Sequence, residues 1–121
     1  MKYHGIIVEE SLVDNRILNN MDMLKVKITS AENKDDRWHL FEVDMEENKM
    51  ENLSKQIIEG WYAHFWYGTG MNFETVDIII VFTNKIFKFN YMDKKTWEEV
   101  IEYSKKLNIS SEELDFHIFG I

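Results

Sequence analysis

Six segments of the chain have the residue pattern of β-strands, and this feature constrains the fold more than any other. In residues 24–29, for example, apolar side chains alternate with lysine and threonine, which is the period-two pattern of a strand with one buried face. The six segments are residues 2–9, 24–29, 37–45, 61–67, 76–82 and 86–91. The second and third are separated by a short polar turn and therefore predict an antiparallel hairpin.

Two further segments have helical spacing. In residues 47–59 apolar side chains recur every three or four positions, Asn48 and Glu51 suit a capping box, and Gly60 suits the residue after the helix end. The second helix is expected after Asp93 or Thr96, either of which can cap it, and runs to about residue 107.

The order β-β-β-α-β-β-β-α predicts an α+β fold in one domain spanning residues 1–121. We expect a two-layer sandwich, in which a mostly antiparallel sheet carries both main helices on one face. A doubly wound parallel sheet is disfavoured, because too few of the strands are joined through helices.

Composition excludes several classes of function. The 121 residues include 22 acidic and 14 basic side chains, a net charge of -8, which disfavours direct binding to nucleic acid or to an anionic membrane surface. The absence of cysteine excludes disulfides, thiol nucleophiles and zinc–thiolate sites. The first residues lack the pattern of an export signal, and the longest apolar run, Ile78–Phe82, is too short to span a membrane. We therefore expect a cytoplasmic location.

Short phrases distributed over most of the chain form a pattern found elsewhere. They are KYHG at residues 2–5, ESL at 10–12, WYAxF at 61–65, NKIFK at 84–88 and LDF at 114–116. With them the chain resembles a group of small, uncharacterised single-domain proteins from bacteria and archaea. In that group an acidic residue tends to follow the WYA phrase, whereas this chain has His64. Because the group has no established activity, the resemblance implies a fold and no mechanism.

The densest chemical feature is the aromatic segment at residues 61–67. On a strand, Tyr62, His64 and Trp66 share one face, while Trp61 lies with the residues of the other face. An exposed face with two aromatic rings and an imidazole would suit a flat ligand or a protein partner. The alternative is that both faces are covered and the rings only fill the core. We assign Trp61, Tyr62, His64 and Trp66 as candidate binding residues.

The other motifs predict neither a metal site nor a cofactor, and no catalytic residue is assigned. None of the four histidines has the spacing of helical metal ligands. The acidic residues 42–51 lack the glycine of a calcium loop, because Lys49 occupies its position, and charge at a helix start explains much of this cluster. Two histidine–carboxylate pairs suit a small enzyme if strands bring them together, namely His64 with Asp77 and Asp115 with His117.

Our main hypothesis is a non-enzymatic binding or interaction domain that uses the aromatic strand face in an acidic surround. Its partner would be another protein or a second copy of the chain. Three alternatives remain open at this point. The first is an acidic inhibitor of a nucleic-acid-binding protein, such as a phage or mobile element might carry, and the second is a small enzyme with a cross-strand site. The third is a small-molecule sensor in which Tyr62 and Trp66 line a pocket beside the sheet.

Overall fold

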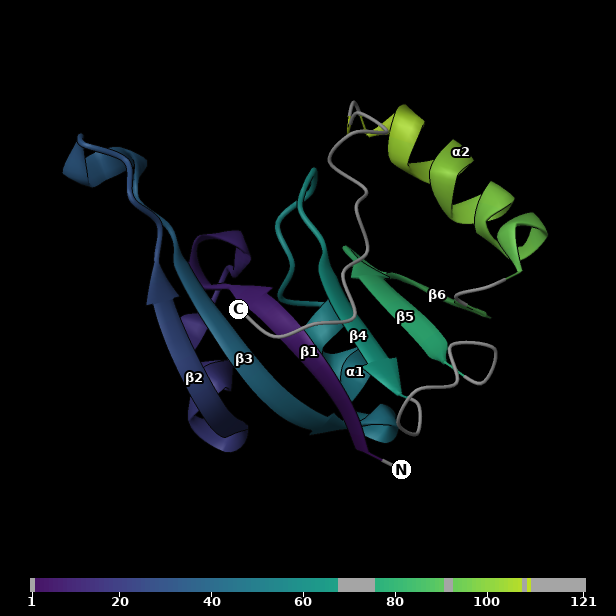
Figure 1. Cartoon of the computed structure of the whole chain (residues 1–121), viewed down its shortest axis with the longest axis horizontal. Helices are drawn as coiled ribbons and strands as arrows, with labels where there is room; N and C mark the ends of the chain where they lie inside the picture. The colour runs from purple at the N-terminus through teal and green to yellow at the C-terminus, as the bar shows by residue number, and fades with distance from the viewer. Residues whose placement is uncertain (1, 68–75, 91–92, 108, 110–121) are drawn as a thin grey trace.

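The structure is a computed structural model, and it describes residues 2–67, 76–90, 93–107 and 109. Six strands form one sheet (Figure 1), in the order β2-β3-β1-β4-β5-β6, and every neighbouring pair is antiparallel. The α+β class, the antiparallel sheet and all six predicted strands are confirmed. The strands are β1 (Lys2–Val8), β2 (Asp22–Ile28), β3 (His39–Glu46), β4 (Ala63–Tyr67), β5 (Asp77–Phe82) and β6 (Lys85–Asn90).

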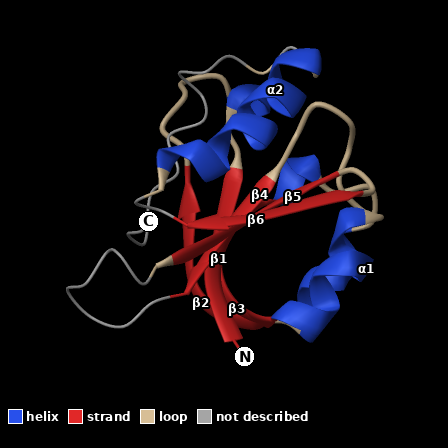
Figure 2. Cartoon of the chain, turned by 90° about the vertical axis from the view of Figure 1, so that its right-hand side faces the viewer, coloured by secondary structure: helices blue, strands red, loops and turns tan. Residues whose placement is uncertain are grey.

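The two helices lie on opposite faces of the sheet, and the prediction of both on one face is wrong. Helix α1 (Met50–Ser54) packs on the face that carries Ile79 and Val81, whereas α2 (Glu98–Lys106) packs on the face that carries Ile78 and Ile80. Figure 2 shows the sheet between them. The reason is that β5 has large apolar side chains on both of its faces, so each face needs its own cover.

Each helix completes a separate buried cluster. On the α1 face the cluster is centred on residues that are fully or almost fully buried: Tyr3, Ile7, Val43, Met50, Leu53, Ile57, Ala63, Phe65, Ile79 and Val81. On the α2 face the cluster contains Val76, Ile78, Ile80, Phe82, Phe89, Val100 and Ile109. The partly buried side chains of Trp97, Ile101 and Leu107 pack against this second cluster.

Helix α1 ends five residues earlier than predicted, because the chain after it pairs with a distant segment. The amide of Val13 donates to the carbonyl of Gln56 at 2.7 Å, and the amide of Ile58 donates to the carbonyl of Ser11 at 2.8 Å. These bonds hold the segment outside a helix. Gly60, which was expected at the helix end, has a φ of 93° in a turn where the Trp61 amide donates to the Ile58 carbonyl at 3.0 Å.

The ends of α2 follow the sequence closely. The carboxylate of Asp93 accepts a hydrogen bond from the Lys95 amide at 3.2 Å, so Asp93 caps the 3₁₀ turn η6 (Lys94–Trp97) that leads into α2. At the other end the amide of Ile109 donates to the carbonyl of Ser104 at 3.0 Å, and Ile109 is buried. A backbone bond of this span together with an apolar contact is the usual close of a helix.

Short 3₁₀ turns connect the first strands. The turn η1 (Glu9–Ser11) directly follows β1, and η2 (Asn15–Asn20) leads to β2. Asp14 caps η2 by accepting from the Arg16 amide, and the hydrogen bonds from Arg16 lower the pKa of Asp14 to about 2. A further turn, η3 (Lys34–Asp36), connects β2 to β3, and η4 (Glu47–Lys49) precedes α1. Among the described residues, no helix is long and apolar enough to cross a membrane.

Gly5 provides a test of how tightly the central strands pack. It lies opposite Phe65 in the pairing of β1 with β4, and a Cβ at this position would clash with Phe65 Cδ1 and lie 2.6 Å from the His64 carbonyl oxygen. We predict that Gly5→Ala lowers the free energy of unfolding by about 2–3 kcal/mol, because the backbone oxygen has no room to retreat. Denaturant titration followed by circular dichroism measures this loss.

Gly60→Ala is the matched control. A Cβ at Gly60 meets nothing within 4 Å, but its φ of +93° strains an alanine, so we expect a smaller loss of about 1 kcal/mol. Equal losses for the two variants would contradict the steric explanation for Gly5.

Candidate binding surfaces

The predicted aromatic face exists and is half-buried. Tyr62, His64 and Trp66 form a row, in which the ring of His64 lies 6.4 Å from Tyr62 and stacks on Trp66 at 5.6 Å between centroids. Tyr62 and Trp66 also pack against the buried cluster below α2, where the Tyr62 ring lies 5.9 Å from Phe82. These side chains therefore belong partly to the core and leave part of each ring at the surface.

The row continues onto β1 and β3, where it meets two carboxylates. His4 lies opposite Trp66 in the strand pairing, with the two rings edge to face at 5.1 Å. The Nδ1 atom of His4 is 2.8 Å from Asp44 Oδ1, and its Nε2 atom is 3.4 Å from Glu42 Oε1. Aromatic faces and carboxylates both attract cations. We call the surface formed by Tyr62, His64, Trp66, His4, Glu42 and Asp44 the aromatic–acidic face.

Trp61, the fourth predicted residue, lies elsewhere. It packs against the buried cluster on the α1 face, and its ring meets Trp38 edge to face at 5.1 Å between centroids. Trp38 precedes β3 and is 45% exposed. The structure therefore brings three of the four predicted residues together and places Trp61 in a separate pair.

Among the described residues, the largest group of exposed apolar side chains lies on β2, at the edge of the sheet. Every residue of this strand is exposed, including Leu24 at 51%, Val26 at 52% and Ile28 at 54%. Val26 and Ile28 lie opposite Phe41 and His39 of β3, while Leu24 sits at an irregularity in the pairing. The sequence predicted a buried apolar face for this strand, and the described residues leave that face largely open.

The pairing of His64 with Asp77, considered for an enzyme, is wrong. In the register of β4 with β5, His64 lies opposite Ile80, whereas Asp77 lies opposite Tyr67. The two residues are therefore three positions apart along the ladder, and their side chains point to opposite faces. Asp115 and His117, the other pair, lie outside the described residues.

A second histidine cluster, which the sequence did not predict, joins η1 to β3. The Nδ1 atom of His39 lies 2.8 Å from Glu10 Oε2 and 3.4 Å from Glu9 Oε2. The hydrogen bond with Glu10 raises the pKa of His39. Burial raises the pKa of Glu10, but the hydrogen bonds from the ring and the backbone of His39 outweigh it and lower that pKa below its usual range.

The pairing of β1 with β3 is the feature from which this cluster could have been predicted. Val8 lies opposite Leu40 when β1 pairs with β3, so the residues that follow β1 meet the residue that begins β3. Local sequence patterns such as helical spacing carry no information about a contact between residues about thirty positions apart.

The described residues thus present three chemically different surfaces. One is the open apolar edge at β2, the second is the aromatic–acidic face, and the third is the cluster of His39 with two glutamates. No protein-family model, no curated protein and no solved structure matches this chain.

Proposed function

We propose that the protein is a non-catalytic interaction domain that pairs with a second copy of itself through the open edge of β2. This strand is the last of the sheet, and its pairing among the described residues is with β3 alone. The outer edge of such a strand offers a row of backbone N–H and C=O groups that another strand can bind.

The concentration of exposed apolar side chains on this edge carries the proposal. Nine large apolar side chains are strongly exposed in the described part of the chain, and five of them belong to β2 or to the segment between β2 and β3. They are Met23, Leu24, Val26, Ile28 and Trp38. Removing apolar surface from water is favourable by roughly 25 cal/mol per Å², so a partner strand that covers them gains affinity from both side chains and backbone.

Charge complementarity favours a second copy as this partner. An antiparallel register that places Asp22 opposite Lys27 of the other copy also places Met23 opposite Val26, and two-fold symmetry makes each contact twice. Registers centred on Lys25 or Lys27 instead oppose lysine with lysine.

The first test introduces a charge at the centre of the proposed interface. We predict that the wild-type chain sediments as a dimer, and that Val26→Lys weakens dimerisation at least about ten-fold, because each interface loses two apolar contacts and gains two charges. Sedimentation velocity over a series of protein concentrations measures this.

Ile86→Lys is the matched control, since Ile86 is an exposed apolar residue of β6 at the opposite edge of the sheet. This variant should dimerise like the wild type. A wild-type chain that stays monomeric at the highest attainable concentration, or two variants that behave alike, would overturn the proposal.

The aromatic–acidic face supports a second candidate function, the binding of an arginine or lysine side chain of a partner protein. The observation that favours it is the placement of Glu42 and Asp44 beside His4, at the end of a row of rings that reaches Trp66. It also gives the acidic-inhibitor alternative a specific surface, because proteins that bind nucleic acid present such cations.

This second candidate predicts a local response to a cationic probe. Titration with an arginine-rich peptide should shift the NMR signals of the Trp66 indole and the His4 ring. Asp44→Asn should weaken that binding by about two- to five-fold, because it removes one partly exposed charge. Added salt should weaken it further.

Glu51→Gln is the control, since Glu51 is an exposed acidic residue of α1 on the other face of the sheet. If the two variants lose affinity equally, the peptide responds to net charge and the aromatic–acidic face has no special role.

A further inference from the structure

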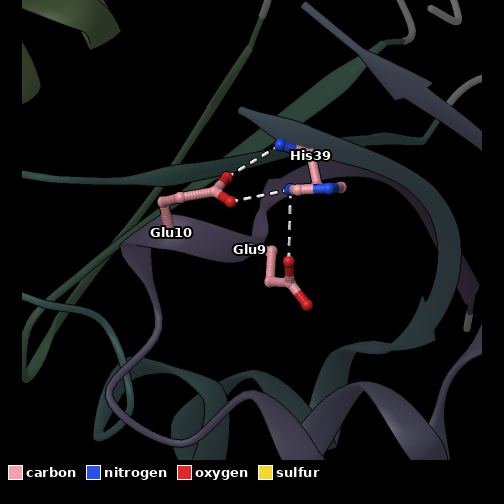
Figure 3. A group of neighbouring side chains, drawn as sticks. All are labelled: Glu9, Glu10 and His39. Atoms are coloured by element: carbon pink, nitrogen blue, oxygen red, sulfur yellow. Dashed lines mark hydrogen bonds and ion pairs between the residues drawn. The ribbon is translucent and has the colours of Figure 1, made fainter. Parts of the chain in front are cut away.

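The chain leaving β1 turns at once into η1, and this turn directs two consecutive glutamates toward one imidazole (Figure 3). One ligand atom from each of Glu9, Glu10 and His39 lies within 4.8 Å of the other two. All three side chains are partly exposed, between 30% and 42%. The group is therefore accessible from solvent and is held by a backbone that the sheet fixes in place.

Each glutamate has one oxygen held by a neighbouring donor and the other directed at His39. Glu10 Oε1 accepts from the backbone amide of His39 at 2.7 Å, and Glu9 Oε1 accepts from Asn15 Nδ2 at 3.3 Å. The Oε2 atoms of both residues face the Nδ1 atom of His39. Outer hydrogen bonds of this kind orient the ligands of metal ions in proteins.

The separations of these atoms fit the coordination shell of a small divalent ion. Metal–ligand bonds of about 2.0–2.1 Å at tetrahedral angles leave neighbouring donor atoms about 3.3–3.4 Å apart. The Nδ1 atom of His39 lies 3.4 Å from the Glu9 oxygen and 2.8 Å from the Glu10 oxygen. The distance from His39 Nδ1 to the Glu10 oxygen must therefore lengthen by about half an ångström, which is a small movement for a glutamate side chain.

The donor set narrows the identity of the ion. One imidazole with two carboxylates and no thiolate suits zinc, which accepts nitrogen and oxygen ligands and leaves a fourth position for water. An open surface hollow of about 440 Å³ is lined by Glu9 together with Asn15, Arg16 and Phe41, whereas Glu10 and His39 do not line it. Water can reach the fourth position, because the side chains of all three ligands are partly exposed.

His4 shows that an imidazole between two carboxylates is not sufficient to form a metal-binding site. Its carboxylate neighbours contact different ring nitrogens, Asp44 at Nδ1 and Glu42 at Nε2. These two nitrogens point away from each other across the ring, so one ion cannot bind the histidine and both acids at once. At His39, by contrast, both carboxylates converge on Nδ1.

We infer that Glu9, Glu10 and His39 bind a single Zn²⁺ ion, with water in the remaining position. This inference is independent of the proposed dimer, because all three ligands come from one chain.

The experiment titrates zinc chloride into the full chain, purified without a histidine tag and treated with EDTA, by isothermal titration calorimetry. We expect one ion per chain, and a loss of affinity of at least about 100-fold in His39→Ala, since removing a ligand should cost more than removing an outer contact. Glu10→Gln should also bind weakly, and His4→Ala should bind like the wild type.

Circular dichroism of each variant shows whether it is folded, and NMR of the histidine rings locates the ion in the wild type. The inference is overturned if the wild type binds no zinc, if His39→Ala binds as tightly as the wild type, or if the His4 ring responds in place of the His39 ring.

Discussion

Strand β5 is apolar on both faces, and the arrangement of the rest of the molecule depends on covering it. Residues 78–82 are all almost completely buried, which requires one layer above the sheet and another below it. The chain supplies these layers with α1 on one face and α2 on the other. Strand β2 is four positions away from β5, about 19 Å at the usual strand spacing, whereas a helix is about 10 Å wide. The two helices therefore leave the β2 edge uncovered.

The strands and the second helix could be predicted because their signals are local. Alternation of side chains decides which residues can form a strand, and Asp93 and Ile109 mark the ends of α2 within a few residues of the helix itself. The end of α1 and the face on which each helix lies could not be predicted in this way. Both depend on contacts between distant segments, such as the pairing of Ser11 and Val13 with residues 56–58.

The candidate sites show the same division. The density of rings around Trp66 was visible in the sequence, and the structure confirms that Tyr62, His64 and Trp66 share one face. The sequence could not show how deeply these rings are buried, because their burial depends on contacts with Phe82 and with α2. The contact of Glu10 with His39 follows from the pairing of β1 with β3, so correct pairing of the predicted strands would have located it.

The net charge of -8 is easier to interpret once the partners of the acidic residues are known. Asp22 is paired with Lys2, Asp14 with Arg16 and Glu47 with Lys88, so these three acids are neutralised locally and the excess negative charge resides on other residues. The carboxylates that face an imidazole differ from these, because a metal ion can take the place of the proton between the carboxylate and the ring nitrogen. Whether one ion can bind the imidazole and both carboxylates depends more on which ring nitrogen each carboxylate faces than on the residue types present. Two carboxylates that face the same ring nitrogen, as at His39, can bind one metal ion together with that nitrogen. Two carboxylates that face different nitrogens of one ring, as at His4, lie too far apart to do so.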